Sequence, residues 1–252
     1  MNAIAATPHP SRPHLARRLG AEFLGTGLLV TVVVGSGIAA QRLSPGDIGL
    51  QLLENSLTTA LGLSVLILML GPVSGAHFNP IVSLVDWFIS RRSNTGLPLR
   101  DLAPYIVAQI AGGICGTLLA GLMFDAAPAL SPNDRATGGH LVSEIVATTG
   151  LVLLIFALAR AGNGAVTAAA VGAYIGAAYW FTSSTSFANP AVTIARMFTD
   201  TFTGIAPGSV LPFILMQVIG AAIGLALVLF FYPNSTRVAD NVVVPHPDAT
   251  KA

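Results

Sequence analysis

The chain has 252 residues, of which 53% are hydrophobic and only 9% are charged. Soluble domains carry roughly a quarter charged residues, so this composition excludes an ordinary soluble protein. The net charge of +1 argues against a nucleic-acid partner. The single cysteine, Cys115, excludes an internal disulfide and suggests no thiolate metal site.

Six long hydrophobic segments follow one another along the chain. A helix needs about 20 residues to cross a hydrocarbon core of about 30 Å, and each segment has close to that length. Three segments contain no charged residue, and the other three carry one carboxylate each. We therefore predict an all-α membrane protein with six transmembrane helices, over residues 19–40, 49–70, 102–124, 140–158, 165–182 and 210–232.

Two shorter apolar segments lie between these spans, 79–89 after the second and 189–199 after the fifth, and both begin with Asn-Pro. Asn is a favoured N-cap and Pro fits the first helical position, so Asn-Pro indicates a helix start. Eleven residues form a helix of about 16 Å, which is half of the hydrocarbon core. We predict two re-entrant half-helices whose N-termini meet at the midplane.

The two halves of the chain resemble each other. The Asn-Pro segments are 110 positions apart, and four other matches are 108 apart: Pro104, Gln109, Gly112 and Gly116 with Pro212, Gln217, Gly220 and Gly224. Three spans per half make the second half enter from the opposite side, which gives an inverted repeat. The recurring glycines let helix backbones approach closely.

The basic residues predict the orientation. Nine of them fall on the side of the N-terminus and three on the other side, which satisfies the positive-inside rule with both termini cytoplasmic. The nine are Arg12, Arg17, Arg18, Arg91, Arg92, Arg100, Arg160, Arg237 and Lys251, and the three are Arg42, Arg135 and Arg196.

The meeting point of the half-helices is the predicted pore centre. Two helix N-termini each bring about half a positive charge there, which disfavours cations. A neutral solute can exchange its water hydrogen bonds for the amides of the two Asn side chains. The predicted centre consists of Asn79, Pro80, Ile81, Asn189, Pro190 and Ala191.

We expect one channel domain over residues 17–232, between polar tails at 1–16 and 233–252. Its first repeat covers about 17–125 and its second about 140–232.

The chain contains six spans and two Asn-Pro boxes, that is, the Asn-Pro pairs with their flanking loops. The first box reads Ser74-Gly-Ala-His-Phe-Asn79-Pro80. With these features, the chain from about 15 to 232 resembles the major intrinsic protein family of aquaporins and aquaglyceroporins. The resemblance implies an aquaporin-like fold, a homotetramer with one pore per subunit, and a second constriction outside the centre. It also implies that Glu22 and Glu144 brace the re-entrant loops. We favour this over a proton relay, because a carboxylate inside a membrane must find donors. His77 belongs to the loop signature, and we favour a structural role for it over pH sensing.

The sequence departs from the family pattern at two positions. Ile81 replaces the alanine of the first box. Val192 stands directly after the second box, where members usually carry the arginine that narrows and charges the outer filter.

The other filter positions can be estimated by spacing. Ala177 lies twelve residues before Asn189 and Ser186 lies three before it, while the position in the second span is Thr59 or Leu61. Since none of these is aromatic or charged, we expect a wide and comparatively apolar filter.

Arg196 follows Val192 by one helical turn. It could extend into the outer mouth, but we favour a surface pair with Asp200 at i,i+4 spacing.

The leading hypothesis is a passive channel for glycerol-like polyols and undissociated arsenite-type hydroxides, with some water flux. Some bacterial relatives without the filter arginine pass such hydroxides. The alternatives are a water-selective aquaporin and, less favoured, an ion-coupled secondary transporter. We expect no enzyme, cofactor or metal site. The predicted location is the lipid bilayer of the cell inner (plasma) membrane.

Overall fold

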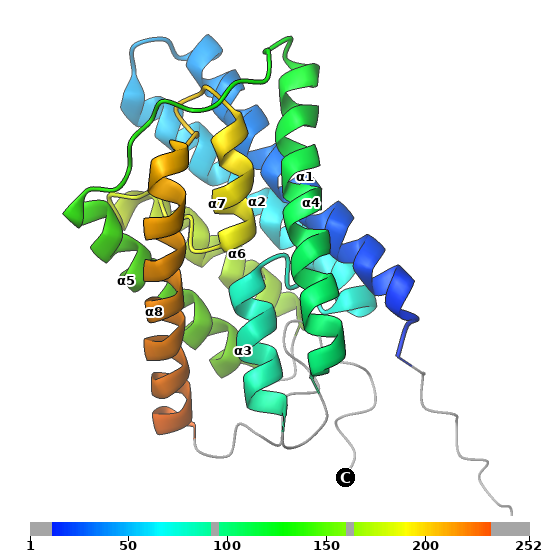
Figure 1. Ribbon diagram of the computed structural model, residues 1–252. Coiled ribbons are helices and arrows are strands. Elements are labelled where there is room, and N and C mark those ends of the chain that lie inside the picture. Colours follow the sequence, from blue (N-terminus) through cyan, green and yellow to red (C-terminus); the bar gives the residue numbers. More distant parts are fainter. Residues whose placement is uncertain (1–11, 92–95, 160–163, 233–252) are drawn as a thin grey trace, which may run out of the picture.

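The computed structural model describes residues 12–91, 96–159 and 164–232, and the regular secondary structure in these ranges is helical (Figure 1). The elements in chain order are α1 (Leu15–Leu43), α2 (Ile48–Ser74), α3 (Pro80–Ser90), α4 (Leu99–Met123), α5 (Gly138–Ala159), α6 (Gly164–Phe181), α7 (Pro190–Ala195), the 3₁₀ helix η1 (Arg196–Phe198) and α8 (Pro207–Phe231). The expected tail at 233–252, most of the tail at 1–16, and Arg92, Arg160, Arg237 and Lys251 lie outside the described residues.

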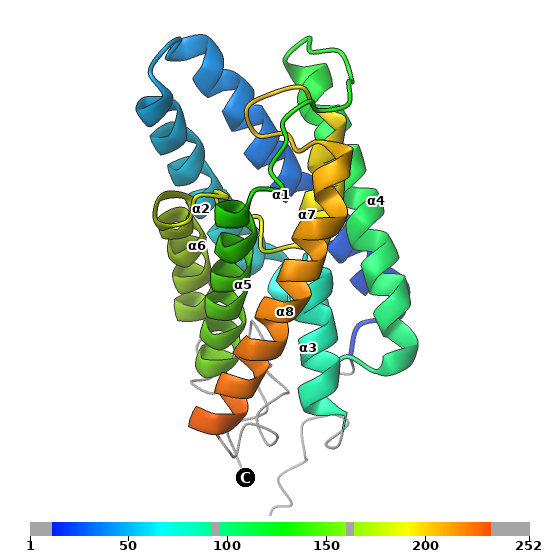
Figure 2. The ribbon, with the colours of Figure 1, turned by 60° about the vertical axis from the view of Figure 1, so that its left-hand side comes forward.

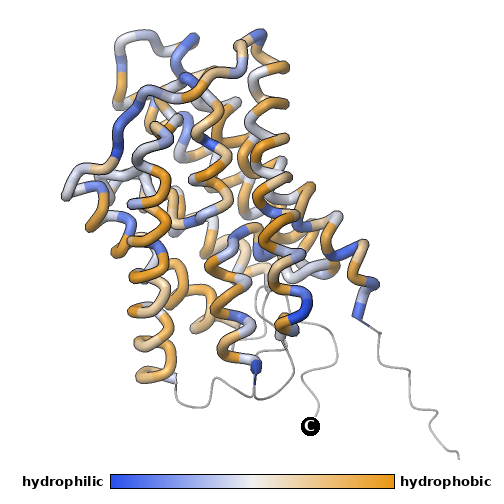
Figure 3. Tube along the Cα trace, viewed as in Figure 1, coloured by the Kyte–Doolittle hydropathy of each residue, from blue (hydrophilic) through white to orange (hydrophobic). Residues whose placement is uncertain are grey.

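Each of the six predicted spans corresponds to one long helix. Five of these, α1, α2, α4, α5 and α8, are long and apolar enough to cross a membrane. Helix α6 has 18 residues and therefore a length of about 27 Å, slightly less than the hydrocarbon core. Figure 3 shows hydrophobic residues along the long helices and hydrophilic residues concentrated toward their ends and the connections.

The two half-helices run end to end through the middle of the bundle. In both views α3 occupies the lower half and α7 the upper half, with their N-termini toward each other (Figures 1 and 2). Helix α3 has 11 residues, as predicted.

The prediction for the second half-helix was too long. Its α-helical part has only six residues, and η1 continues it for three more. The tightening has a local cause, because neighbouring loops use the carbonyls at this end. The carbonyl of Arg196 accepts from Ile205 N at 3.3 Å, and that of Met197 accepts from Ser131 N at 2.9 Å.

The two halves pack in the same way. Helix α1 lies against α4, α5 lies against α8, and the α2–α6 contact joins the halves. Glycines allow the backbones to touch. A Cβ at Gly116 would lie 2.1 Å from the carbonyl oxygen of Gly27, and one at Gly220 would lie 2.6 Å from that of Ile145. The predicted role of these glycines in close helix packing agrees with this geometry.

Replacing Gly116 by alanine should lower the thermal stability of the protein. The added methyl group would overlap the backbone of Gly27, and such overpacking costs roughly 1–3 kcal/mol. Thermal unfolding in detergent measures this. Gly20→Ala in α1 is the matched control, because a Cβ there has no neighbour within 4 Å. Equal melting temperatures for the two variants would contradict the proposed contact.

Candidate functional site

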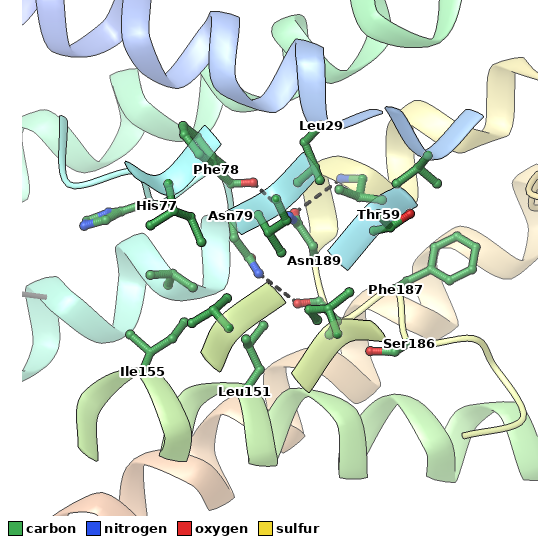
Figure 4. A pocket seen from close by; sticks show the side chains of 18 of the residues that line it. Leu29, Thr59, His77, Phe78, Asn79, Leu151, Ile155, Ser186, Phe187 and Asn189 are labelled. Atoms are coloured by element: carbon green, nitrogen blue, oxygen red, sulfur yellow. Dashed lines mark hydrogen bonds between the residues drawn. The ribbon is translucent and has the colours of Figure 1, made fainter. Parts of the chain in front are cut away.

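Asn79 and Asn189 face each other where the half-helices meet (Figure 4). Each side-chain oxygen caps its own helix, since Oδ1 of Asn79 accepts from Ile81 N at 2.9 Å and Oδ1 of Asn189 accepts from Ala191 N at 3.0 Å. Each side-chain nitrogen crosses to the other loop. Nδ2 of Asn79 donates to the Ala188 carbonyl at 2.8 Å, and Nδ2 of Asn189 donates to the Phe78 carbonyl at 2.7 Å.

In this crossed pair, each Asn carboxamide keeps one N–H that can donate to a solute. A carboxamide has two N–H donors, and the opposite carbonyl takes one from each Asn. Both Asn side chains line the same cavity. The remaining N–H groups and the two helix N-termini therefore give the centre of the cavity a donor character and a positive potential.

The loops before both Asn residues have the same unusual backbone. Ala76 and Phe78 have φ of 49° and 48°, and their counterparts Ser186 and Ala188 have φ of 52° and 45°. Non-glycine residues in this left-handed region cost roughly 1–3 kcal/mol each. Such loops persist only where their surroundings hold them.

Glu22 holds the first loop. Its Oε1 accepts from the Ser74 hydroxyl at 2.6 Å and from His77 N at 3.0 Å. Its Oε2 accepts from Phe78 N and from Gln109 Nε2, both at 2.7 Å. The carboxylate is fully buried, so these four donors replace its hydration.

Glu144 holds the second loop with the same set of bonds. Oε1 accepts from the Ser184 hydroxyl at 2.7 Å and from Phe187 N at 2.9 Å. Oε2 accepts from Ala188 N at 2.9 Å and from Gln217 Nε2 at 2.7 Å. The inverted repeat therefore extends to individual hydrogen bonds.

The cavity at the Asn pair has a volume of about 60 Å³. A water molecule needs roughly 10–15 Å³ of such space, so the cavity holds a few waters or one small solute. One part of its wall is polar, with the Asn pair and residues of both loops. Another part is aliphatic and comprises Leu29, Val33, Leu63, Ile67, Leu151, Ile155, Val171 and Ile175.

The remaining residues of the predicted centre do not line the cavity. Ile81, the departure from the family pattern in the first box, is buried in the hydrophobic core and is outside the cavity lining. Pro80, Pro190 and Ala191 are buried in the first turns of α3 and α7, outside the cavity lining.

Comparison with known proteins agrees with this architecture. A family model described as Major intrinsic protein matches residues 10–186. The aquaglyceroporin AqpS of Rhizobium meliloti (strain 1021) is 52% identical over 214 residues, which cover 84% of this chain and 89% of that protein.

The chain belongs to the major intrinsic protein family.

Two further proteins are similar to this chain at lower identity. The glycerol uptake facilitator protein of Pseudomonas aeruginosa is 31% identical over 188 residues, 63% of this chain and 62% of that protein. The X-ray structure of the aquaglyceroporin from Plasmodium falciparum has a TM-score of 0.64 at 21% identity, with 90% of this chain and 99% of that chain covered. At that identity the likeness shows the fold alone.

In this major intrinsic protein the outer part of the cavity differs from the spacing-based filter. Thr59 is buried and lines the cavity, whereas Leu61 is 62% exposed on the outside of the bundle. The assignment of Leu61 is therefore wrong. Two residues rotate a helix by about 200°, so both cannot face the same side.

The prediction for α6 was wrong for the same reason. Ala177 is exposed on the outer surface, and Tyr179, two residues later, lines the cavity. The Tyr179 hydroxyl lies 3.2 Å from the Thr59 hydroxyl. Ser186 does line the cavity, and its buried hydroxyl has no partner among the described residues.

The position of Arg196 also differs from the surface pair with Asp200 that we favoured. It is 2% exposed and lines the cavity together with Val192. Its Nε donates to the Thr203 carbonyl at 2.5 Å, and its guanidinium lies 3.6 Å from the centre of the Phe187 ring. The ion pairs of the described residues do not include Arg196 with Asp200, which is exposed. The part of the cavity where the filter was expected is thus lined by Tyr179 and Arg196, and it is more polar and more crowded than predicted.

His77 is fixed inside the protein. Its Nδ1 lies 3.1 Å from the Ser83 hydroxyl, and its ring lies 5.6 Å from the ring of Tyr105. This arrangement supports the structural role. Within the described residues, His, Cys, Asp and Glu form no cluster of three or more suited to a metal ion.

Proposed function

We propose that this protein is a passive channel for small uncharged hydroxylated solutes, including glycerol-like polyols and undissociated arsenite-type hydroxides, with some water flux. The crossed Asn79–Asn189 pair carries the proposal, because it presents free amide donors inside a cavity whose other wall is aliphatic. A polyol has one edge of hydroxyl groups and one edge of C–H groups. It can therefore exchange its water hydrogen bonds at the polar wall while its carbons lie against the aliphatic wall.

The named relatives support the same class of solute. The aquaglyceroporin AqpS and the glycerol uptake facilitator are both similar to this chain. A trihydroxide such as undissociated arsenite has hydroxyl groups in a comparable arrangement, so the same wall suits it.

A water-selective pore is the second candidate. Tyr179 and Arg196 both line the outer cavity, and this favours a narrower filter than the spacing predicted. An ion-coupled transporter is less compatible with the site. Its coupling acid must face the path, whereas Glu22 and Glu144 are fully buried and each accepts four hydrogen bonds.

We also propose a homotetramer in the cell inner membrane with both termini cytoplasmic. The start of α1 and the end of α8 lie at the same end of the bundle (Figure 1). Arg17, Arg18, Arg91 and Arg100 belong to that end, whereas Arg42, Arg135 and Arg196 belong to the other, and this supports the orientation.

Stopped-flow light scattering on purified protein in liposomes tests the proposed solutes. Water, glycerol and undissociated arsenite are compared with protein-free liposomes. We expect all three to cross faster when the protein is present. Water flux without glycerol or arsenite flux would replace this proposal by the water-selective alternative.

A further inference from the structure

Arg196 places a charged side chain in the outer part of the cavity, where Val192 replaces the arginine usual in the family. It follows Val192 by four residues, so its Cα lies about 6 Å further along the helix axis. The side chain nevertheless lines the same cavity as Thr59, Tyr179 and Val192. A guanidinium therefore reaches the outer constriction from one turn further out.

The guanidinium is held on two sides. Its face lies against the Phe187 ring at 3.6 Å, and its Nε donates to the Thr203 carbonyl. Phe187 itself is fixed by an edge-to-face contact with Phe213 at 5.3 Å. A stacked and hydrogen-bonded guanidinium has one orientation, in contrast to a mobile surface arginine.

Its two terminal nitrogens are free to bind a solute. The protein hydrogen bonds of the described residues use only Nε of Arg196. The terminal nitrogens are also not among the buried polar atoms that lack a partner, so they are accessible from the cavity. The buried Ser186 hydroxyl, which lacks a protein partner, lines the same cavity. The two terminal nitrogens therefore offer a fork of donors, whereas the Ser186 hydroxyl is buried within the cavity wall.

Arg135, in the connection between α4 and α5, fixes the segment that holds Arg196. Its Nε donates to the Gly204 carbonyl at 2.7 Å and its Nη2 to the Phe202 carbonyl at 2.6 Å. These two carbonyls flank that of Thr203, which accepts from Arg196. Arg135 also lies 5.2 Å from the centre of the Phe187 ring.

We propose that Arg196 is the specificity-determining residue of the outer constriction and that Arg135 is its positioning residue. This inference rests on the proposed channel function and concerns how it selects among solutes. The Arg196 fork donates to hydroxyl oxygens of neutral solutes. Its charge excludes cations, and its bulk excludes polyols larger than glycerol.

Arg196→Met tests the proposal, because methionine removes the charge and the donors but keeps an unbranched side chain. We measure the water, glycerol and erythritol permeabilities and the sodium leak of proteoliposomes. The ratio of erythritol to water permeability should rise about tenfold, because methionine does not place a planar guanidinium across the constriction and larger polyols can then pass. The sodium leak should rise as well. Arg196→Lys should keep sodium out but still raise the erythritol ratio, because lysine lacks the planar fork.

Arg135→Gln should shift the erythritol ratio in the same direction, and Arg135→Lys should restore part of the selectivity. The double variant Arg135→Gln/Arg196→Met should match Arg196→Met alone, because Arg135 acts through Arg196. Arg42→Gln is the control. It removes another outer arginine, which bonds to the Phe124 carbonyl and is outside the cavity lining.

Unchanged erythritol ratios and sodium leak in Arg196→Met, with glycerol still crossing, would overturn the proposal. If Arg196→Met does not fold, unchanged ratios in Arg196→Lys and Arg135→Gln would overturn it. An unmodified protein without glycerol flux would instead refute the proposed function.

Discussion

Replacing Glu144 by leucine is expected to abolish solute flux and to destabilise the protein strongly. Leucine has nearly the same volume but accepts no hydrogen bond, so four buried donors would lose their partner. Each unsatisfied donor costs about 1–3 kcal/mol, and the sum is comparable to the total stability of a typical domain, about 5–15 kcal/mol. The strained loop at Ser186 and Ala188 would also lose its support.

Thermal unfolding and glycerol flux measure this effect. Glu144→Gln should be intermediate, since its amide keeps one acceptor oxygen but sets an NH₂ group against donors. Glu54→Gln is the matched control, because Glu54 lies near the outer end of α2 and accepts from the Ser44 hydroxyl. A Glu144→Leu protein with normal melting temperature and flux would contradict the bracing role.

Replacing Val192 by arginine should reduce glycerol flux more than water flux. Val192 is buried in the cavity wall, and a guanidinium there would stand one turn from that of Arg196. Two like charges and the added bulk would narrow the path, and we expect glycerol permeability to fall by roughly tenfold or more, equivalent to about 1.4 kcal/mol. Val192→Met has similar length without the charge and separates the two contributions. An equal fall for water and glycerol would show that Val192 does not set the width of the filter.

The fold was predictable because the physics of a bilayer is simple. Apolar length predicted the six long helices, and Asn-Pro predicted the starts of α3 and α7, because Asn is a favoured N-cap and Pro fits the first helical position. The end of α7 was not predictable. It coincides with hydrogen bonds from Ser131, which is distant in the chain, and from Ile205, which lies in the following loop.

The filter was predicted less well than the centre. The Asn pair is defined by local motifs, whereas Thr59 and Tyr179 depend on the rotation of α2 and α6. An error of two residues rotates a side chain by about 200° and places it on the outer surface, as happened for Leu61 and Ala177. The position of the Arg196 side chain depends on η1 and on the carbonyl of Thr203. No sequence motif predicts either feature.

The internal repeat contained evidence for the role of two glutamines that the sequence interpretation did not use. Gln109 and Gln217 match in the internal repeat, and both donate to the bracing carboxylates. A polar residue repeated within an apolar span indicates a buried partner of the same repeat, and Glu22 and Glu144 are the repeated candidates. Phe187, next to the second box, had no comparable signal.

Glycerol permeability of the unmodified protein in liposomes, measured with and without a proton gradient, separates a passive pore from a coupled transporter. We expect glycerol flux well above that of protein-free liposomes, proportional to the glycerol gradient and unchanged by the proton gradient. Flux that saturates and requires the proton gradient would contradict a passive pore and would indicate a coupled transporter.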